Sequence, residues 1–113
     1  MFITPLLVMA AMLATPSQTV DTTRLGYTKC LRIFLVTSLK AKMAASEYAV
    51  AVKDTCTAEQ TAFHAAIIAL DRSSGDSLAS AKENADFQVE DYIASFIEKF
   101  NDYNDSGTSP ADD

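Results

Sequence analysis

Glycine and proline are scarce in this chain, with three residues of each type among its 113 residues. Both residue types favour turns over the interior of helices and strands, so their scarcity leaves room for long regular elements. The chain also lacks the alternation of apolar and polar residues that is typical of half-buried strands. Good helix formers are instead frequent between residues 25 and 103. The sequence therefore predicts an all-α protein of one domain, a small bundle of three or four helices.

Residues that usually build catalytic and metal centres are few. The chain has one histidine and two cysteines, and it contains no CxxC, HExxH or GxSxG motif and no glycine-rich phosphate loop. A zinc site needs about four ligands, commonly Cys or His. Cys56 and His64 lie eight residues apart, which is about 12 Å along one helix. Because a nucleophile and its base must lie within hydrogen-bond distance, we expect no enzyme activity, metal or cofactor, and we expect His64 to lie at the side of a helix.

The first residues form an apolar run from Phe2 to Ala14, and the first charged side chain is Asp21. The run is too short to span a bilayer, which takes roughly 20 apolar residues, so no stable membrane anchor is predicted. It is typical of a secretory signal peptide, although no Lys or Arg precedes it and no small-x-small site ends it. A buried N-terminal helix is the alternative. We assign residues 1–20 to a signal peptide and a short linker, and we predict a periplasmic or secreted protein.

Cys30 and Cys56 are the two cysteines of the chain. An even number of cysteines behind a signal peptide predicts a disulfide bond, because exported proteins meet an oxidising environment. The bond would close a loop of about 26 residues and stabilise the fold by roughly 3 kcal/mol through chain entropy. Two free thiols buried as small apolar groups are the alternative. The disulfide would hold together the opening and middle helices of a helical domain at residues 21–103.

Apolar residues recur at helical spacing along a first segment at about residues 24–43, which predicts a helix. This helix is apolar over more than one stripe, so it is either the central helix of the core or it faces a partner, which leaves a homodimer open. Its main stripe consists of Tyr27, Cys30, Leu31, Phe34, Leu35 and Ser38.

A short helix is predicted next, with Ser46 as its N-terminal cap. It either continues through Cys56 or ends before it, because TAEQ has the form of a capping box with Thr57 as cap and Gln60 three residues on. The helix beyond this point has the buried stripe Phe63, Ala66, Ile67 and Leu70.

A turn at Gly75 separates this helix from the last and longest one, which Asp76 or Ser77 caps. The last helix is predicted to run to about Tyr103, and residues 104–113 are predicted to form a disordered acidic tail because they are polar and contain Gly and Pro. The expected buried stripe of the last helix is Leu78, Ala81, Ala85, Val89, Tyr92, Phe96, Phe100 and Tyr103.

Charge is divided unevenly along the chain. Residues 21–72 contain seven Lys or Arg and five Asp or Glu, whereas residues 73–113 contain two and ten. Nucleic acid would be repelled by the second part, so nucleic-acid binding is excluded. The acidic side chains project from the solvated face of the last helix, which keeps the protein soluble or docks a basic partner protein, and their spacing there does not indicate acid–base catalysis. The candidate partner-binding face consists of Glu83, Asp86, Glu90, Asp91 and Glu98.

Short motifs between YTKCL and FNDY, over about 75 residues, carry a resemblance to a known group. They comprise Tyr27, Cys30-Leu31, Cys56, Glu59, Phe63, Glu83-Asn84-Ala85, Glu90-Asp91-Tyr92 and Asn101-Asp102-Tyr103. On these motifs the chain resembles small, uncharacterised secreted two-cysteine helical proteins of alphaproteobacterial type. The resemblance implies no particular activity.

A second resemblance lies in the segment TCTAEQTAF, with Cys56, Glu59, Gln60 and Phe63. It is similar to the segment that follows the second cysteine of periplasmic acid-stress chaperones, which are small helical proteins with one disulfide. The resemblance implies that acid would protonate the carboxylates of residues 73–113, loosen the bundle and expose Phe87, Phe96 and Phe100. We rank a non-enzymatic binding or structural module first and this chaperone function second.

Overall fold

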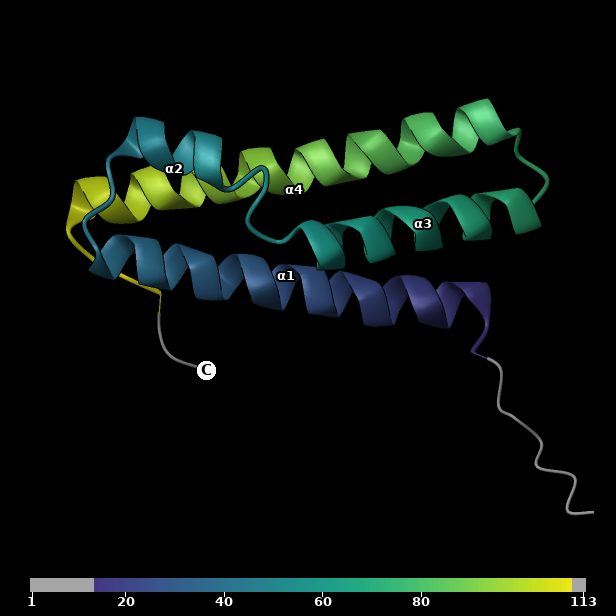
Figure 1. Cartoon of the computed structure of the whole chain (residues 1–113), viewed down its shortest axis with the longest axis horizontal. Coiled ribbons are helices and arrows are strands. Elements are labelled where there is room, and N and C mark those ends of the chain that lie inside the picture. Colours follow the sequence, from purple (N-terminus) through teal and green to yellow (C-terminus); the bar gives the residue numbers. More distant parts are fainter. Residues whose placement is uncertain (1–13, 111–113) are drawn as a thin grey trace, which may run out of the picture.

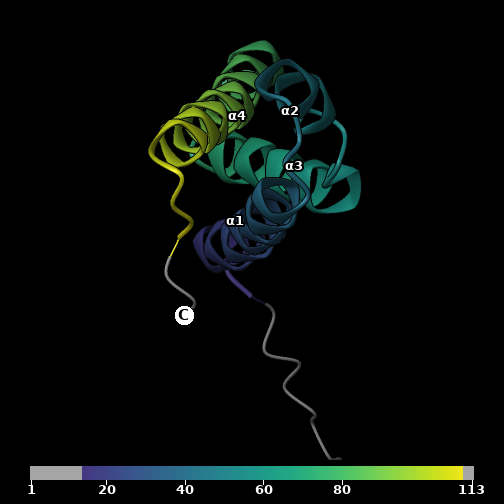
Figure 2. The ribbon, with the colours of Figure 1, turned by 90° about the vertical axis from the view of Figure 1, so that its left-hand side faces the viewer.

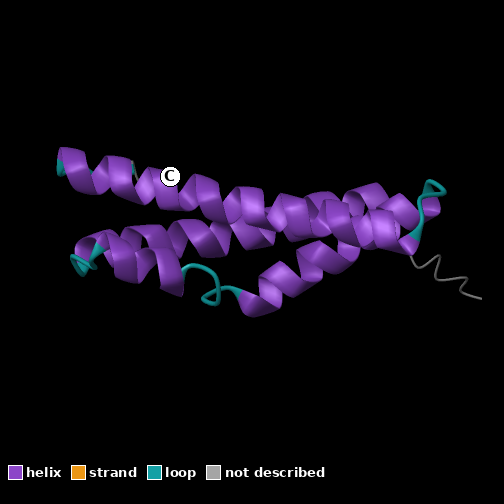
Figure 3. Cartoon of the chain, turned by 90° about the horizontal axis from the view of Figure 1, so that it is seen from above, coloured by secondary structure: helices purple, strands orange, loops and turns teal. Residues whose placement is uncertain are grey.

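The computed structural model describes residues 14–110, and these form four α-helices and no β-strand (Figures 1 and 3). The helices are α1 (Pro16–Lys40), α2 (Ala45–Ala51), α3 (Thr57–Ser73) and α4 (Leu78–Ser106). This architecture confirms the predicted all-α fold. The predicted signal peptide falls mostly on residues 1–13, which lie outside the described residues, so it stays a prediction.

The two long helices α1 and α4 run in the same direction, and α3 runs in the opposite direction against both (Figure 1). The short helix α2 packs against the C-terminal part of α4, near the end of the bundle that lies furthest from the start of α1 (Figures 1 and 2). A non-helical stretch at residues 52–56 separates α2 from α3. The helices α2 and α3 therefore cover different ends of the pair formed by α1 and α4.

A first group of aromatic rings joins α1, α3 and α4. The ring of Tyr27 in α1 lies 5.9 Å from that of Phe63 in α3 and 6.1 Å from that of Tyr92 in α4, centroid to centroid. Such pairs add attraction to the burial of their apolar surface. The observed core largely confirms the predicted stripes. It includes the buried residues Tyr27, Leu31, Leu35, Phe63, Ala66, Ile67, Ala85, Val89, Phe96 and Phe100.

A second aromatic group anchors α2. The ring of Tyr48 stacks on Phe100 of α4 at 4.2 Å and on Phe34 of α1 at 5.4 Å. An isolated helix of seven residues is unstable in water, so its stability must come from packing. Tyr48 is completely buried and supplies that packing.

The start of α1 differs from the prediction, because the helix begins at Pro16 and not near Arg24. Thr15 and Gln18 form a capping box, in which the Thr15 hydroxyl accepts from the Gln18 amide at 3.2 Å and the Gln18 side chain accepts from the Thr15 amide at 3.0 Å. Pro16 at the first helical position is compatible with a helix start. Val20 of the predicted linker is buried in the core, so the folded part begins before residue 21.

Both predicted caps in the middle of the chain are wrong. Ala44, not Ser46, precedes α2, and α2 ends before the chain reaches Cys56. Cys56, not Thr57, occupies the cap position of α3, and no side chain caps this end. The Thr57 hydroxyl instead donates to the Asp54 carbonyl at 2.8 Å. The predicted interruption of the helix near Thr57 is therefore confirmed, and the predicted capping box is not.

The predicted boundary between α3 and α4 is confirmed. Gly75 has a φ of 97°, a conformation that favours glycine. The Ser77 hydroxyl then caps α4 by accepting from the Ser80 amide at 3.1 Å. Leu78 departs from the predicted stripe, because 54% of its surface is exposed.

The end of α4 lies beyond the predicted one. The helix continues to Ser106, so residues 104–106 of the predicted disordered tail are helical. Gly107 ends the helix in the left-handed conformation, with a φ of 67°, and the Thr108 amide donates to the Tyr103 carbonyl at 3.0 Å. Residues 111–113 lie outside the described residues.

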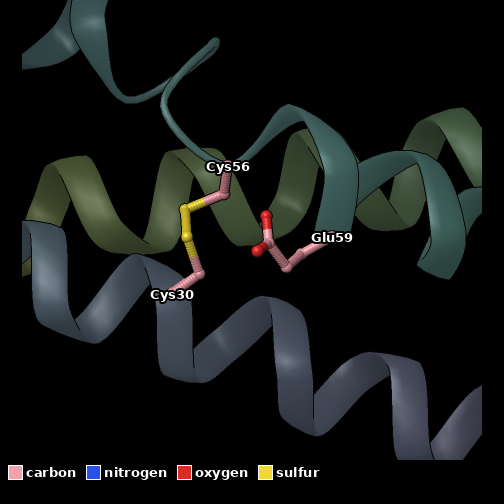
Figure 4. Close-up of side chains that lie close together, drawn as sticks. All are labelled: Cys30, Cys56 and Glu59. Carbon is pink, nitrogen blue, oxygen red and sulfur yellow. A yellow bond between two sulfur atoms is a disulfide. The ribbon is translucent and has the colours of Figure 1, made fainter.

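Cys30 of α1 and Cys56 are joined by a disulfide, with their Cα atoms 6.1 Å apart (Figure 4). The predicted pairing is therefore confirmed. The bond connects the middle of α1 to the residue that precedes α3, across a sequence separation of 26 residues.

The hydroxyls of Tyr27 and Tyr48 are buried and have no hydrogen-bond partner among the described residues. Burial disfavours the phenolate and raises the pKa of each tyrosine to about 12. The unfolded chain releases these protons near pH 10, about two pH units earlier. Between these values the native state binds more protons, so stability must fall as pH rises.

We predict that replacing both cysteines, Cys30→Ser with Cys56→Ser, lowers the free energy of unfolding by about 3 kcal/mol. The physical reason is the larger conformational freedom of the uncrosslinked unfolded chain. Urea unfolding measures the change. A reductant should destabilise the wild-type chain by a similar amount and leave the double variant unaffected. Two cysteines that react with an alkylating reagent in the untreated native protein would contradict the prediction.

We predict that the wild-type chain loses about 2 kcal/mol more stability between pH 9 and pH 11 than a chain carrying Tyr27→Phe and Tyr48→Phe. The variant keeps both rings and removes the two groups whose protonation opposes unfolding. Urea unfolding at the two pH values measures this difference, and lysine titration cancels in the comparison. Equal losses for both chains would show that these hydroxyls do not cause the alkaline destabilisation.

Candidate functional site

One group of described residues brings three possible metal-ligand side chains together. Atoms of Cys30, Cys56 and Glu59 lie within 4.8 Å of one another, and Glu59 projects from the first turn of α3 towards the disulfide (Figure 4). The two sulfurs are bonded to each other, whereas metal binding and nucleophilic attack both require a thiolate. In this state the group is structural, and the Glu59 carboxylate lies near the positive end of the α3 dipole.

His64 lies at the side of α3, as predicted, and it contacts α4. Its Nε2 atom is 2.7 Å from Oδ1 of Asp86, and the two side chains are 29% and 62% exposed. Asp86 belongs to the predicted acidic face, so one member of that face is engaged within the chain. A second polar contact joins the same helices, since the Asn84 amide donates to the Asp71 carboxylate at 2.7 Å.

A groove lies beside the His64–Asp86 contact, between α3 and α4. Its volume is about 730 Å³, and Val89, Ile93 and Ile97 provide apolar lining. Charged groups of both signs also line it, among them Lys53 and Glu90. Because both signs are present, the groove has no clear preference for a cation or an anion.

All five residues of the predicted acidic face are exposed on α4: Glu83, Asp86, Glu90, Asp91 and Glu98. Three of them share one hollow of about 530 Å³ with the aromatic ring of Phe87, and these are Glu83, Asp86 and Glu90. We call this set, Glu83, Asp86, Phe87 and Glu90, the acidic strip. Asp91 and Glu98 lie outside the hollow.

Phe87 is the member of the acidic strip that the sequence reasoning missed. Its side chain is 66% exposed in the native fold, so its exposure does not require acid. Phe96 and Phe100, which were grouped with it, are buried. A signal was present in the sequence, because Phe87 follows Ala85 by two residues and precedes Val89 by two, which places it opposite their buried stripe.

Comparisons with known proteins identify no relative. A scan against models of protein families, a search of curated proteins and a search of solved structures each return no match to this chain. Within residues 14–110, no helix has the length and apolar character needed to cross a membrane.

Proposed function

We propose that this protein is a non-enzymatic binding module of the periplasm or extracellular space, and that the acidic strip docks a basic partner protein. The observation that carries the proposal is the exposed ring of Phe87 in a hollow lined by Glu83, Asp86 and Glu90. The disulfide and the apolar N-terminal run support the location outside the cytoplasm. The resemblance to secreted two-cysteine helical proteins of alphaproteobacterial type is part of the same proposal.

An exposed apolar side chain is common and needs no explanation when it stands alone. Phe87 differs from the other exposed apolar residues because three carboxylates and one cation, Lys82, line the hollow that it shares, which leaves this hollow with a net negative charge. Aromatic residues often supply much of the binding energy of an interface, and surrounding charges set its specificity and association rate. The partner that fits is a basic segment with an apolar pocket that accepts the ring.

Phe87 offers a direct test by photo-crosslinking in the native host. A photoreactive phenylalanine analogue at position 87 should give a discrete adduct with one partner. The same analogue at Val50, which is 68% exposed on α2, is the matched control and should give none. Combining the analogue at position 87 with Glu83→Gln, Asp86→Asn and Glu90→Gln should abolish the adduct, because the strip then attracts no cations.

The captured partner then allows affinity to be measured with purified proteins. Phe87→Ala should weaken binding at least tenfold while changing the free energy of unfolding by less than about 0.5 kcal/mol, as is usual for surface substitutions. Binding should also weaken as salt rises. Equal adducts at positions 87 and 50, or an affinity that salt does not change, would refute docking at the acidic strip.

A second candidate function is that of an acid-activated chaperone, and the contacts between α3 and α4 favour it. The two polar contacts described between these helices both end on carboxylates, those of Asp86 and Asp71. Protonation removes the negative charge of both acceptors, which weakens charge-assisted hydrogen bonds. Separation of α3 and α4 would part the rings of Phe63 and Tyr92, which lie 5.7 Å apart, and would expose the buried Phe63 to client proteins.

We predict for this candidate that the protein suppresses client aggregation at about pH 2.5 and not at pH 7, with a parallel rise in the fluorescence of a dye that binds apolar surface. A chain with Asp71→Asn and Asp86→Asn should gain activity at a higher pH than the wild type. Asp54→Asn with Asp102→Asn, at exposed positions outside these contacts, provides the control. Absence of protection at every pH would remove the chaperone function.

A further inference from the structure

A second groove lies between α1 and α4, and we call it the basic groove. Its volume is about 420 Å³, and three cationic side chains line it, Arg24 and Arg32 from α1 and Lys99 from α4. None of the described residues that line it is Asp or Glu. In a chain with a formal net charge of −6, this concentration of positive charge is a local exception. Such a groove raises the local concentration of anions.

The basic groove also has an apolar floor and further hydrogen-bonding groups. Leu35 and Phe96 line it and are buried in the core. The hydroxyl-bearing residues Tyr92, Ser95 and Tyr103 line the same space. Ligand sites commonly combine an apolar lining with a few polar groups that fix the orientation of the ligand. A small inorganic anion would leave the apolar floor unused, so the ligand needs an apolar body as well as a charge.

Two of the cations are held in place by aromatic rings. The Nζ atom of Lys99 lies 4.7 Å from the centroid of Phe96, and the guanidinium of Arg24 lies 5.6 Å from that of Phe63. Arg24 also contacts the exposed carboxylate of Asp21 at 3.1 Å. An exposed ion pair of this kind is weak, so Arg24 still attracts anions to the groove. The rings thus position the cations before any ligand arrives, which favours binding.

The shape of the basic groove follows from the two helices that form it. Arg24 and Arg32 lie eight residues apart on α1, which corresponds to about 12 Å along the helix. The segment after α4 turns towards α1, and Pro110 in this segment lines the groove (Figures 1 and 2). Leu25 lines the groove too and is 70% exposed. The groove is therefore elongated and has apolar residues at its rim.

We propose that the basic groove binds an amphiphilic carboxylate, a molecule with one anionic head and an extended alkyl body. The carboxylate pairs with the ammonium of Lys99, since charge-assisted hydrogen bonds to carboxylates are strong, and Arg24 adds positive potential further along the groove. The alkyl body covers Leu35 and Phe96 and contacts Leu25. This site is separate from the acidic strip, so it can be tested independently of the proposed function.

Isothermal titration of the full chain with dodecanoate, below the concentration at which it forms micelles, tests the proposal. One molecule should bind per chain, and binding should weaken at higher salt. Lys99→Gln should weaken it at least fivefold, and Arg24→Gln should weaken it less, because Arg24 acts through its charge at a distance. Lys29→Gln is the matched control, because Lys29 is an exposed cation of α1 that does not line the basic groove. Leu25→Gln, at an exposed position, should weaken binding without disturbing the core.

Comparison ligands separate the contributions of charge and chain. Dodecyltrimethylammonium has the same alkyl chain with a positive head, and acetate has the carboxylate without the chain, so neither should bind. Substitutions in the acidic strip should leave dodecanoate binding unchanged. Equal weakening by Lys29→Gln and Lys99→Gln would overturn the proposal, as would equal binding of the cationic amphiphile. Binding to anionic lipid vesicles without binding to dodecanoate would assign the groove to a membrane surface instead and would also overturn it.

Discussion

The bond between Cys30 and Cys56 determines where α3 starts beside α1, and the packing of the bundle depends on that point. Tyr27 precedes Cys30 by one helical turn, and Phe63 follows Cys56 by two turns. Because α1 and α3 run in opposite directions, Tyr27 and Phe63 both lie on the same side of the disulfide along the bundle. The centroids of their rings are 5.9 Å apart. A domain of this size buries a modest core, so a covalent link that brings its central rings together contributes a large share of its stability.

The helix α4 contributes to two surfaces of opposite charge. Its outer face carries Glu83, Asp86 and Glu90 around the exposed ring of Phe87. Its flank against α1 carries Lys99, which lines the same groove as Arg24 and Arg32 from the other helix. The uneven charge of the chain is therefore a poor guide to the charge of its surfaces, because packing places cations of the first half in one groove with a cation of the acidic second half. The proposed docking surface and the proposed ligand groove are consequences of this arrangement.

The sequence predicted correctly which face of each long helix is buried, because that face follows from the spacing of apolar residues within the helix. Most errors concerned the ends of the helices. The stripes of α1, α3 and α4 were largely correct, because the side that an amphipathic helix buries follows from its own residues. The caps were harder, because several nearby residues compete for the same backbone groups. Thr15 and Gln18 form a capping box next to a run assigned to a leader, and Thr57 loses the cap position of α3 to Cys56. The stop at Gly107 was missed for a similar reason, since a polar segment with glycine is typical of both a tail and a helix end.

The sequence by itself determined the all-α class, the buried faces of the helices, the candidate disulfide partners and the exposure of the acidic residues on α4. Each of these depends on residue type and on spacing within one segment. The tertiary structure decided which segments meet: it placed His64 against Asp86, and it brought Arg24 and Lys99, 75 residues apart, into one groove. Contacts of this kind depend on how neighbouring helices pack and on how far each slides along the next, and no period within a single helix carries that information.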